Sequence, residues 1–284
     1  MRIAIVTDEI SRDPLTAIEL GREWGVEWFE LRMLLGKRFP DVDDGLLHRV
    51  RALLGDLGGR ISATSPGFFK TPVTDAGVRD ILKGDFPRAL ELTRQLGADR
   101  MIVFAFLRPE GDRREAEPPG AVGDLVAEMA EQAASAGVLC LLENEAICYG
   151  DTGLRAEALI RAVGHANLRL NWDPGNSVHA GSRCPYPDEY VQVRDLVAHV
   201  HVKDMAFSGE KLVTVAPGDG IIDWRGQLAA LDADGYDGFV TVETHFGPKV
   251  TASRRSVAWV KARLAELAPP DAGGSARVRR LRTR

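Results

Sequence analysis

The chain has 284 residues, of which 45% are hydrophobic and 27% are charged, a length and composition that suit one globular domain with a substantial core. No apolar stretch reaches the ~20 residues that span a bilayer, and no signal-peptide pattern precedes the first apolar run, so we expect a cytoplasmic protein. The formal net charge is −5 and becomes −10 without the five arginines of the last eight residues, which argues against a nucleic-acid-binding surface.

Eight strand-like apolar runs alternate with amphipathic stretches along the chain. The first run, residues 2–8, precedes a helix that we expect to begin at Asp13 and Pro14 and to end before Gly25. Seven further strand-like runs occupy residues 27–32, 60–65, 99–106, 138–145, 167–173, 196–204 and 237–243. Helical stretches, several of them closed by glycine, occupy residues 46–58, 86–97, 121–137, 154–164, 224–235 and 257–267.

This alternation predicts an α/β fold, a (β/α)8 TIM barrel that forms a single domain over residues 1–267. An open, doubly wound sheet is the alternative, and it is weakened because no GxGxxG motif follows the first strand. Residues 268–284 open with proline and glycine and end in arginines, so we expect them to form a flexible basic C-terminal tail outside the barrel.

Four strand-like runs in the C-terminal half end on a side chain that binds metals well. They are Glu143, Asp173, His201 and Glu243, separated by 30, 28 and 42 residues, enough each time for one strand, one helix and two loops. In a parallel barrel the C-terminal strand ends share one face, so the four side chains can converge on one cation. His199 points the same way as His201 but lies one layer deeper, which predicts a core or supporting histidine.

Three carboxylates and an imidazole suit one divalent ion, Mn²⁺ or Mg²⁺, and Zn²⁺ or Co²⁺ fit as well, so the ligand set alone does not choose the metal. An ion pair is the alternative for any one of the acids, because a carboxylate buried alone is very costly. Three acids placed in the same way on three strands favour a shared metal site.

Cationic side chains near the ends of the earlier strands are candidates for substrate binding. Arg32 and Lys70, together with Arg108, end or follow the second, third and fourth strands and are placed to bind a phosphate or carboxylate, with simple solvation as the alternative. Glu30, near the end of the second strand, is expected either to pair with Arg32 or to accept a hydrogen bond from a substrate hydroxyl.

Residues after the sixth, seventh and eighth strands are further candidates. Lys203 and Asp204 directly follow His201 and are expected to hydrogen-bond the substrate or to orient the metal ligands, with a surface ion pair as the alternative. His179 and His245 fall in loops of the same face and are candidates for substrate contact, with ordinary exposed histidines as the alternative.

Other notable residues are expected to be structural. The segment Pro217–Gly220 predicts a tight loop beside the active face rather than a phosphate cradle, and Asp223 is a plausible N-cap for the next helix. Trp172 points away from Asp173 and should pack in the core. The three cysteines, Cys140, Cys148 and Cys184, have no CxxC spacing and imply no disulfide.

In combination these segments resemble the xylose isomerase-like TIM barrel family, which is described broadly as sugar phosphate isomerases and epimerases. The resemblance covers roughly residues 1–267 and rests on TDEIS at 7–11, GVEWFELR at 25–32, LLEN at 141–144, DPGN at 173–176, HVHVKD at 199–204, PGDGIIDW at 217–224 and GYDGFVTVE at 235–243.

The resemblance implies roles for particular residues. Glu143, Asp173, His201 and Glu243 match the metal ligands of the family, and in its ketose 3-epimerases the two matching glutamates also exchange the substrate proton. This chain departs from those epimerases at Asn176, where they have a histidine, and at Phe207, where they have an arginine. We place Asn176 among the substrate contacts, and the two differences argue against a free ketohexose as substrate. The resemblance also implies a homodimer or homotetramer.

The expected activity is that of a divalent-metal-dependent isomerase or epimerase acting on a sugar, keto-sugar or inositol-derived substrate. Glu143 and Glu243 are the expected catalytic acids and bases, which remove a proton next to a carbonyl and return it, through an enediolate intermediate. Exchange on two faces of one carbon gives epimerisation, and transfer between neighbouring carbons gives isomerisation.

Three other functions remain open at this point. Loss of a β-hydroxyl from the same enediolate gives a metal-dependent dehydratase or lyase on a related keto-polyol. An endonuclease IV-like DNA repair phosphodiesterase needs more histidines and a less acidic body than this chain has. A barrel without catalysis, used only for binding, would not need four intact ligand positions.

Overall fold

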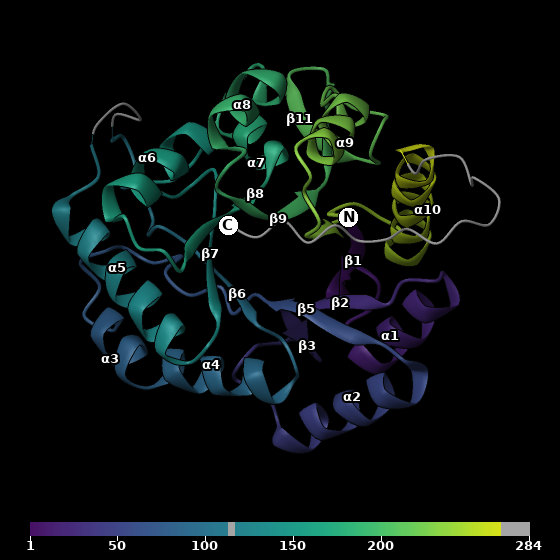
Figure 1. The fold of residues 1–284 in the computed structure, drawn as a ribbon, viewed down its shortest axis with the longest axis horizontal. Coiled ribbons are helices and arrows are strands. Elements are labelled where there is room, and N and C mark those ends of the chain that lie inside the picture. The colour runs from purple at the N-terminus through teal and green to yellow at the C-terminus, as the bar shows by residue number, and fades with distance from the viewer. Residues whose placement is uncertain (113–116, 268–284) are drawn as a thin grey trace, which may run out of the picture.

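Eight parallel strands close into a barrel in the computed structural model, which describes residues 1–112 and 117–267. Figure 1 looks onto this arrangement, with helices around the strands. The strands, in order around the barrel, are β1 (Arg2–Val6), β2 (Trp28–Leu31), β5 (Arg60–Thr64), β6 (Arg100–Val103), β7 (Leu139–Glu143), β8 (Leu168–Trp172), β9 (Val197–Val202) and β12 (Phe239–Val242). All eight expected strands are confirmed, and so is the TIM barrel.

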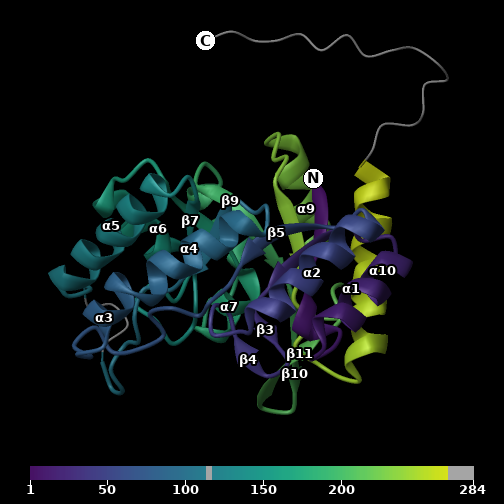
Figure 2. The same cartoon turned by 90° about the horizontal axis from the view of Figure 1, so that it is seen from below.

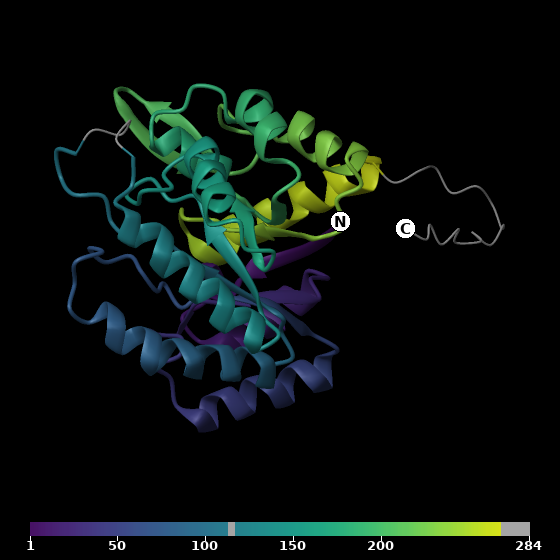
Figure 3. The same ribbon diagram turned by 60° about the vertical axis from the view of Figure 1, so that its left-hand side comes forward.

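The ring closes because the first and last strands pair. Ala4 of β1 lies opposite Thr241 of β12 on one side and opposite Trp28 of β2 on the other. Helices cover the outside of the barrel (Figure 3). The strands are apolar along most of their length because they are buried between these helices and the core of the barrel. Short runs of mostly apolar residues therefore predicted these strands well.

The helices of the barrel follow the strands. They are α1 (Pro14–Glu23), α2 (Asp44–Leu57), α3 (Val78–Lys83), α4 (Asp85–Gln95), α5 (Gly120–Ser135), α6 (Gly153–Val163), α7 (Pro174–His179), α8 (Tyr190–Val193), α9 (Trp224–Ala233) and α10 (Lys249–Leu267), with short helical turns η1 (Thr7–Glu9) and η2 (Pro185–Glu189). Among the helices of the described residues, none combines the length and apolarity that crossing a membrane requires.

Capping residues set the helix boundaries as the sequence indicated. The Asp13 carboxylate accepts a hydrogen bond from the Leu15 amide at 3.1 Å, and Pro14 occupies the first turn of α1. The Asp223 carboxylate likewise accepts from the Gly226 amide at the start of α9. Helix α10 begins eight residues earlier than expected, because its first two turns are largely polar and carry little apolar periodicity.

Two antiparallel hairpins were not expected from the sequence. One pairs β3 (Met33–Leu34) with β4 (Lys37–Arg38) directly after β2, and the other pairs β10 (Asp204–Ser208) with β11 (Lys211–Val215) directly after β9. Figure 2 shows both hairpins at the same end of the barrel, the end where the strands finish. They are therefore placed to border a site at that end. The expected basic tail, residues 268–284, lies outside the described residues, so the domain boundary at 267 stays a prediction.

Candidate active site

The four expected metal-ligand residues meet at the C-terminal end of the barrel. Each of them offers one ligand atom, and these atoms all lie within 4.8 Å of one another. Glu143 is the last residue of β7 and His201 lies near the end of β9, while Asp173 and Glu243 directly follow β8 and β12. All four side chains are buried. The structure thus brings together residues up to 100 positions apart in the chain.

One nitrogen of His201 faces the three carboxylates. Its Nδ1 lies 3.6 Å from Glu143 Oε1, 3.9 Å from Asp173 Oδ2 and 3.5 Å from Glu243 Oε2. This buried nitrogen has no hydrogen-bond partner within the described residues. Separations of this size are those of donor atoms that surround one cation at about 2.0–2.2 Å. The residues present therefore fit a divalent metal ion.

Glu30 lies behind His201 and fixes its orientation. Glu30 Oε2 is 3.0 Å from Nε2 of His201 and 3.2 Å from Nε2 of His199, and His199 is also within 2.8 Å of the Thr241 hydroxyl. Burial raises the pKa of Glu30, but the two histidines outweigh it and lower that pKa to about 2. Glu30 thus supports the site from below, and both expected roles for it, pairing with Arg32 or accepting from a sugar, were wrong.

Neutral amides hold the acids at the ends of β7 and β8. The Asn176 side chain donates to Glu143 Oε1 at 3.0 Å, and that of Asn171 donates to Oε2 at 3.2 Å. The Asn144 side chain donates to the Asp173 carbonyl and accepts from its amide. Burial raises the pKa of Asp173 to about 6, although Lys203 opposes this shift. Asn176 touches a candidate ligand directly, a contact that the sequence alone did not reveal.

Cations, in contrast, surround Glu243. Its Oε1 lies 2.6 Å from Arg32 Nη1 and 3.0 Å from His245 Nε2, and its Oε2 lies 2.8 Å from Lys203 Nζ. Burial raises the pKa of Glu243, but Lys203, His245 and then His201 hold it well below its usual value. Glu143 and Glu243 therefore have different surroundings, although both were expected to do the same chemistry.

Lys203 and Arg32 each bridge several acids. The Lys203 ammonium lies 2.7 Å from Asp173 Oδ2 as well as near Glu243, so it is buried beside the candidate ligands and does not form a surface pair. Arg32 also pairs with Asp8 at 2.9 Å and with Glu9 at 2.5 Å. These carboxylates raise the pKa of Arg32 well above its usual value despite burial, which opposes them.

A pocket of about 350 Å³ opens onto the acids. Six of the side chains expected to contact a substrate line it, namely Arg32, Lys70, Asn176, His179, Lys203 and His245. Lys70 pairs with Glu145 at 2.5 Å and stacks 4.1 Å from the centroid of the Phe104 ring, so its charge is already balanced in the pocket wall. The sequence missed Arg38 of the β3–β4 hairpin and Thr214 of the β10–β11 hairpin, which also line the pocket.

Asp204, another of these candidates, does not line the pocket. Its side chain is buried and accepts hydrogen bonds from the backbone amides of Gly218 at 2.9 Å, Gly220 at 3.1 Å and Ile222 at 3.1 Å. These partners direct the carboxylate toward the loop and not toward the pocket. Asp204 instead fixes the tight loop at 217–220, which the glycines allow because the backbone closes around the carboxylate.

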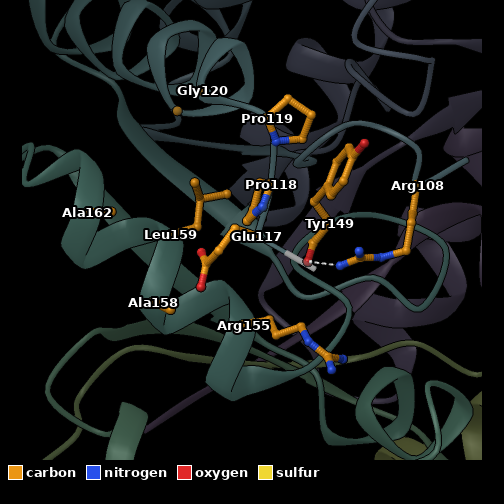
Figure 4. A pocket seen from close by; sticks show the side chains of 11 residues that line it. Arg108, Glu117, Pro118, Pro119, Gly120, Tyr149, Arg155, Ala158, Leu159 and Ala162 are labelled. Carbon is orange, nitrogen blue, oxygen red and sulfur yellow. Dashed lines mark hydrogen bonds between the residues drawn. The ribbon is translucent and has the colours of Figure 1, made fainter. Parts of the chain in front are cut away.

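A second pocket, of about 250 Å³, lies away from the acids (Figure 4). Arg108 borders it, donates to the Tyr149 carbonyl at 3.2 Å and lies 4.8 Å from the centroid of the Tyr149 ring, beside the side chains of Leu159 and Arg155. None of the candidate ligands lines this pocket. Arg108 thus lies in a different pocket from the candidate metal ligands, although the sequence made it a candidate for binding a phosphate or carboxylate of the substrate.

The closed barrel and the acids at its C-terminal end define a TIM barrel with a candidate metal site. The chain belongs to the xylose isomerase-like TIM barrel family, whose model matches residues 18–263. This confirms the resemblance noted in the sequence. A comparison with curated proteins gives no significant match.

Several solved structures share the fold. A xylose isomerase-like TIM barrel protein from Mycobacterium smegmatis, in complex with magnesium, has a TM-score of 0.73 and 20% identity over 89% of this chain and 88% of that one. The probable 3-DHS dehydratase AsbF of Bacillus anthracis, involved in petrobactin synthesis, has a TM-score of 0.73 and 17% identity. That comparison covers 92% of this chain and 99% of AsbF. The 3-keto-D-glucoside 4-epimerase YcjR of E. coli has a TM-score of 0.70 and 20% identity, and the comparison covers 92% of this chain and 99% of YcjR. At such identities the likeness shows the fold alone.

Proposed function

We propose that this protein is a metal-dependent isomerase or epimerase that moves a proton next to the carbonyl of a sugar, keto-sugar or inositol-derived substrate. One observation carries the proposal. Nδ1 of His201, buried and without a hydrogen bond, faces three carboxylates at the base of a pocket of about 350 Å³. Such a pocket has room for a small polyol. The family and the epimerase among the solved structures of the same fold support it.

The cofactor in this proposal is one divalent ion held by Glu143, Asp173, His201 and Glu243. Three oxygen donors favour Mn²⁺ or Mg²⁺, and a protein of the same fold was solved in complex with magnesium. When bound, the ion supplies Lewis acidity, which stabilises negative charge that develops on substrate oxygens.

The two glutamates exchange the proton in this proposal. Their strands, β7 and β12, flank β8 and β9 in the barrel, so Glu143 and Glu243 reach the pocket from two sides. The amides of Asn171 and Asn176 hold Glu143 in place without adding charge. Burial raises the pKa of Glu143, but His201 keeps that pKa below its usual value, so Glu143 stays ionised and able to accept a proton. The cations around Glu243 favour its ionised form and return it to that form after each transfer.

Deuterium exchange tests the proposal. The protein is loaded with Mn²⁺ or Mg²⁺, and ²H incorporation from D₂O into a panel of keto-sugars and keto-inositols is followed by NMR. Glu143→Gln and Glu243→Gln should each lower the exchange rate by about 10²- to 10⁴-fold, because each removes a carboxylate that takes up the proton. Glu91→Gln, on the exposed surface of α4, is the matched control and should exchange normally. Exchange close to the wild-type rate in either active-site variant would refute the assignment.

A dehydratase is the second candidate, and the position of Lys203 favours it. Its ammonium lines the pocket beside Asp173 and Glu243, where it is placed to hydrogen-bond a departing hydroxyl. A probable dehydratase shares the fold. Loss of water from a keto-polyol, detected as a new conjugated double bond by ultraviolet absorbance, would select this reaction over epimerisation.

A further inference from the structure

The β3–β4 hairpin carries Arg38 to the edge of the pocket. Arg38 lines the pocket together with Ser65, Glu143 and His179, although none of the sequence patterns pointed to it. Buried side chains anchor the hairpin at both ends, Leu34 before the turn and Phe39 after it. Arg38 thus extends from a hairpin whose position is fixed by buried side chains.

Arg38 differs from the other lysines and arginines of the pocket in having no acidic partner. Arg32, Lys70 and Lys203 each lie within 2.9 Å of at least one carboxylate. Over residues 1–112 and 117–267 no ion pair involves Arg38, and its one hydrogen bond is a long one of 3.5 Å to the Ser65 carbonyl. Its guanidinium therefore keeps most of its donors for another molecule.

The backbone beneath Arg38 is shaped to receive its guanidinium. Gly67 has a φ of +75°, and a Cβ built there would lie only 2.8 Å from Cζ of Arg38. The glycine therefore leaves room for the guanidinium to lie against the backbone at the pocket edge, while the Arg38 side chain stays exposed. A planar guanidinium in this position can offer two parallel N–H donors to a carboxylate or a phosphate.

The charges of the pocket leave room for an anion. Protein around the guanidinium lowers the pKa of Arg38, and Arg32 lowers it further, while Asp8 and Glu143 act less strongly in the opposite direction. The lining has four positive and three negative side chains, and the buried Asp173, Asp8 and Glu9 beside it bring the sum to −2. A divalent ion at the acids would offset that charge, so Arg38, which pairs with no acid in the described residues, keeps a positive charge at the pocket edge.

We infer that Arg38 forms a subsite for an anionic substituent of the substrate, a carboxylate or a phosphate, at the end of the molecule away from the metal ligands. This inference rests on the proposed function, because it takes the pocket to be the substrate site. It also reassigns the anion-binding role that the sequence suggested for Arg32 and Lys70, both of which are committed to acids of the protein. The substrate class becomes that of sugar acids or sugar phosphates.

Binding of three matched probes tests the inference without turnover. Dissociation constants of D-fructose, D-fructuronate and D-fructose 6-phosphate are measured by NMR titration in the presence of Mg²⁺ and 0.15 M salt. At least one charged probe should bind about 10- to 100-fold more tightly than fructose, as expected for charge-assisted hydrogen bonds. Which of the two does so identifies the anion as a carboxylate or a phosphate.

Two variants make the test specific. Arg38→Met should reduce the preference for the charged probe over fructose to less than about threefold. Lys37→Met, on the same hairpin but outside the pocket lining, should keep the preference, which separates a subsite from a general effect of surface charge. Circular dichroism checks that both variants fold.

Several results would overturn the subsite. They are equal binding of neutral and charged probes by the wild type, no detectable binding of either charged probe, or a preference that survives Arg38→Met. The proposed function fails by a different measurement, the absence of metal-dependent proton exchange. Proton exchange on neutral sugars together with equal binding of neutral and charged probes would support the proposed function and refute the Arg38 subsite.

Discussion

Glu30 determines which nitrogen of His201 is presented to the acids. It occupies Nε2 at 3.0 Å, so the opposite nitrogen, Nδ1, points toward Glu143, Asp173 and Glu243. A carboxylate behind a histidine ligand fixes the ring and makes the ligating nitrogen more basic. A metal site here would therefore depend on a residue that never touches the ion.

Glu30→Gln should weaken metal binding by about 10- to 100-fold, because the amide cannot supply the charge that supports the imidazole. Titration calorimetry with Mn²⁺ measures the effect. Glu27→Gln, an exposed change just before the same strand, is the control and should bind as the wild type does. Unchanged affinity in Glu30→Gln would show that His201 does not need its support.

The three cysteines differ in how well they are shielded. Cys140 and Cys148 are buried, whereas Cys184 is partly exposed. Burial raises the pKa of Cys140 to about 12, and it raises that of Cys148 further still. Since the thiolate is the reactive form, both buried thiols stay protonated and unreactive at pH 8.

Native protein at pH 8 should react rapidly with about one equivalent of a thiol reagent per chain, at Cys184, and with all three cysteines after denaturation. Absorbance of the released thiolate counts the reacted groups, and peptide mass spectrometry identifies them. Rapid labelling of Cys140 in the native state would mean that the barrel opens far more readily than its packing implies.

At the scale of single elements, the loop after β11 depends on one buried carboxylate. Asp204 accepts from three amides of this loop and from the Met205 amide, so the acid replaces the hydrogen bonds that regular structure would give. The Trp224 ring also donates to the neighbouring Lys203 carbonyl at 2.9 Å. The loop and the strand end that carries Lys203 are thus fastened together.

Asp204→Ala should lower the free energy of unfolding by about 1–3 kcal/mol or more, because it leaves buried amides without an acceptor. Urea denaturation followed by circular dichroism measures the change. Asp237→Ala, an exposed change in another loop, should stay within about 0.5 kcal/mol of the wild type. Equal stability of the two variants would contradict a role for Asp204 in holding the loop.

The elements also show what the sequence could and could not predict. Apolar strands such as β7 and β9, and the acids or histidine at their ends, were predictable because burial and strand position follow from local pattern. The β3–β4 hairpin was not, because its strands have two residues each and the exposed Lys37 and Arg38 give no apolar alternation. The ion-pair partners of Arg32 and the histidine partners of Glu30 were not predictable either, because they depend on which strands become neighbours in the barrel.

For the whole molecule, a metal at the candidate site would tie together four strands. Glu143, Asp173, His201 and Glu243 come from β7 through β12, the second half of the barrel, while β1 and β2 close the ring beside them. An ion that binds only when these strands are assembled adds its binding free energy to the folded state. Metal content and stability should therefore change together.

Addition of Mn²⁺ at about 100 times its dissociation constant should stabilise the protein by about 2.7 kcal/mol, and a chain of this length would gain about 5–10 °C in melting temperature. Differential scanning calorimetry with and without EDTA measures the shift. Asp173→Ala, which removes one donor, should show a much smaller metal-dependent shift. Equal melting temperatures with Mn²⁺ and with EDTA would argue against a metal site that forms on folding.

In each of the two hairpins, β3–β4 and β10–β11, the strands pair only with each other and are not part of the barrel. Their tips can therefore be exchanged or redesigned while the ring of strands and its acids stay intact. Grafting the segment from 33 to 38 would thus replace one wall of the proposed substrate pocket and keep the arrangement of the four candidate metal ligands.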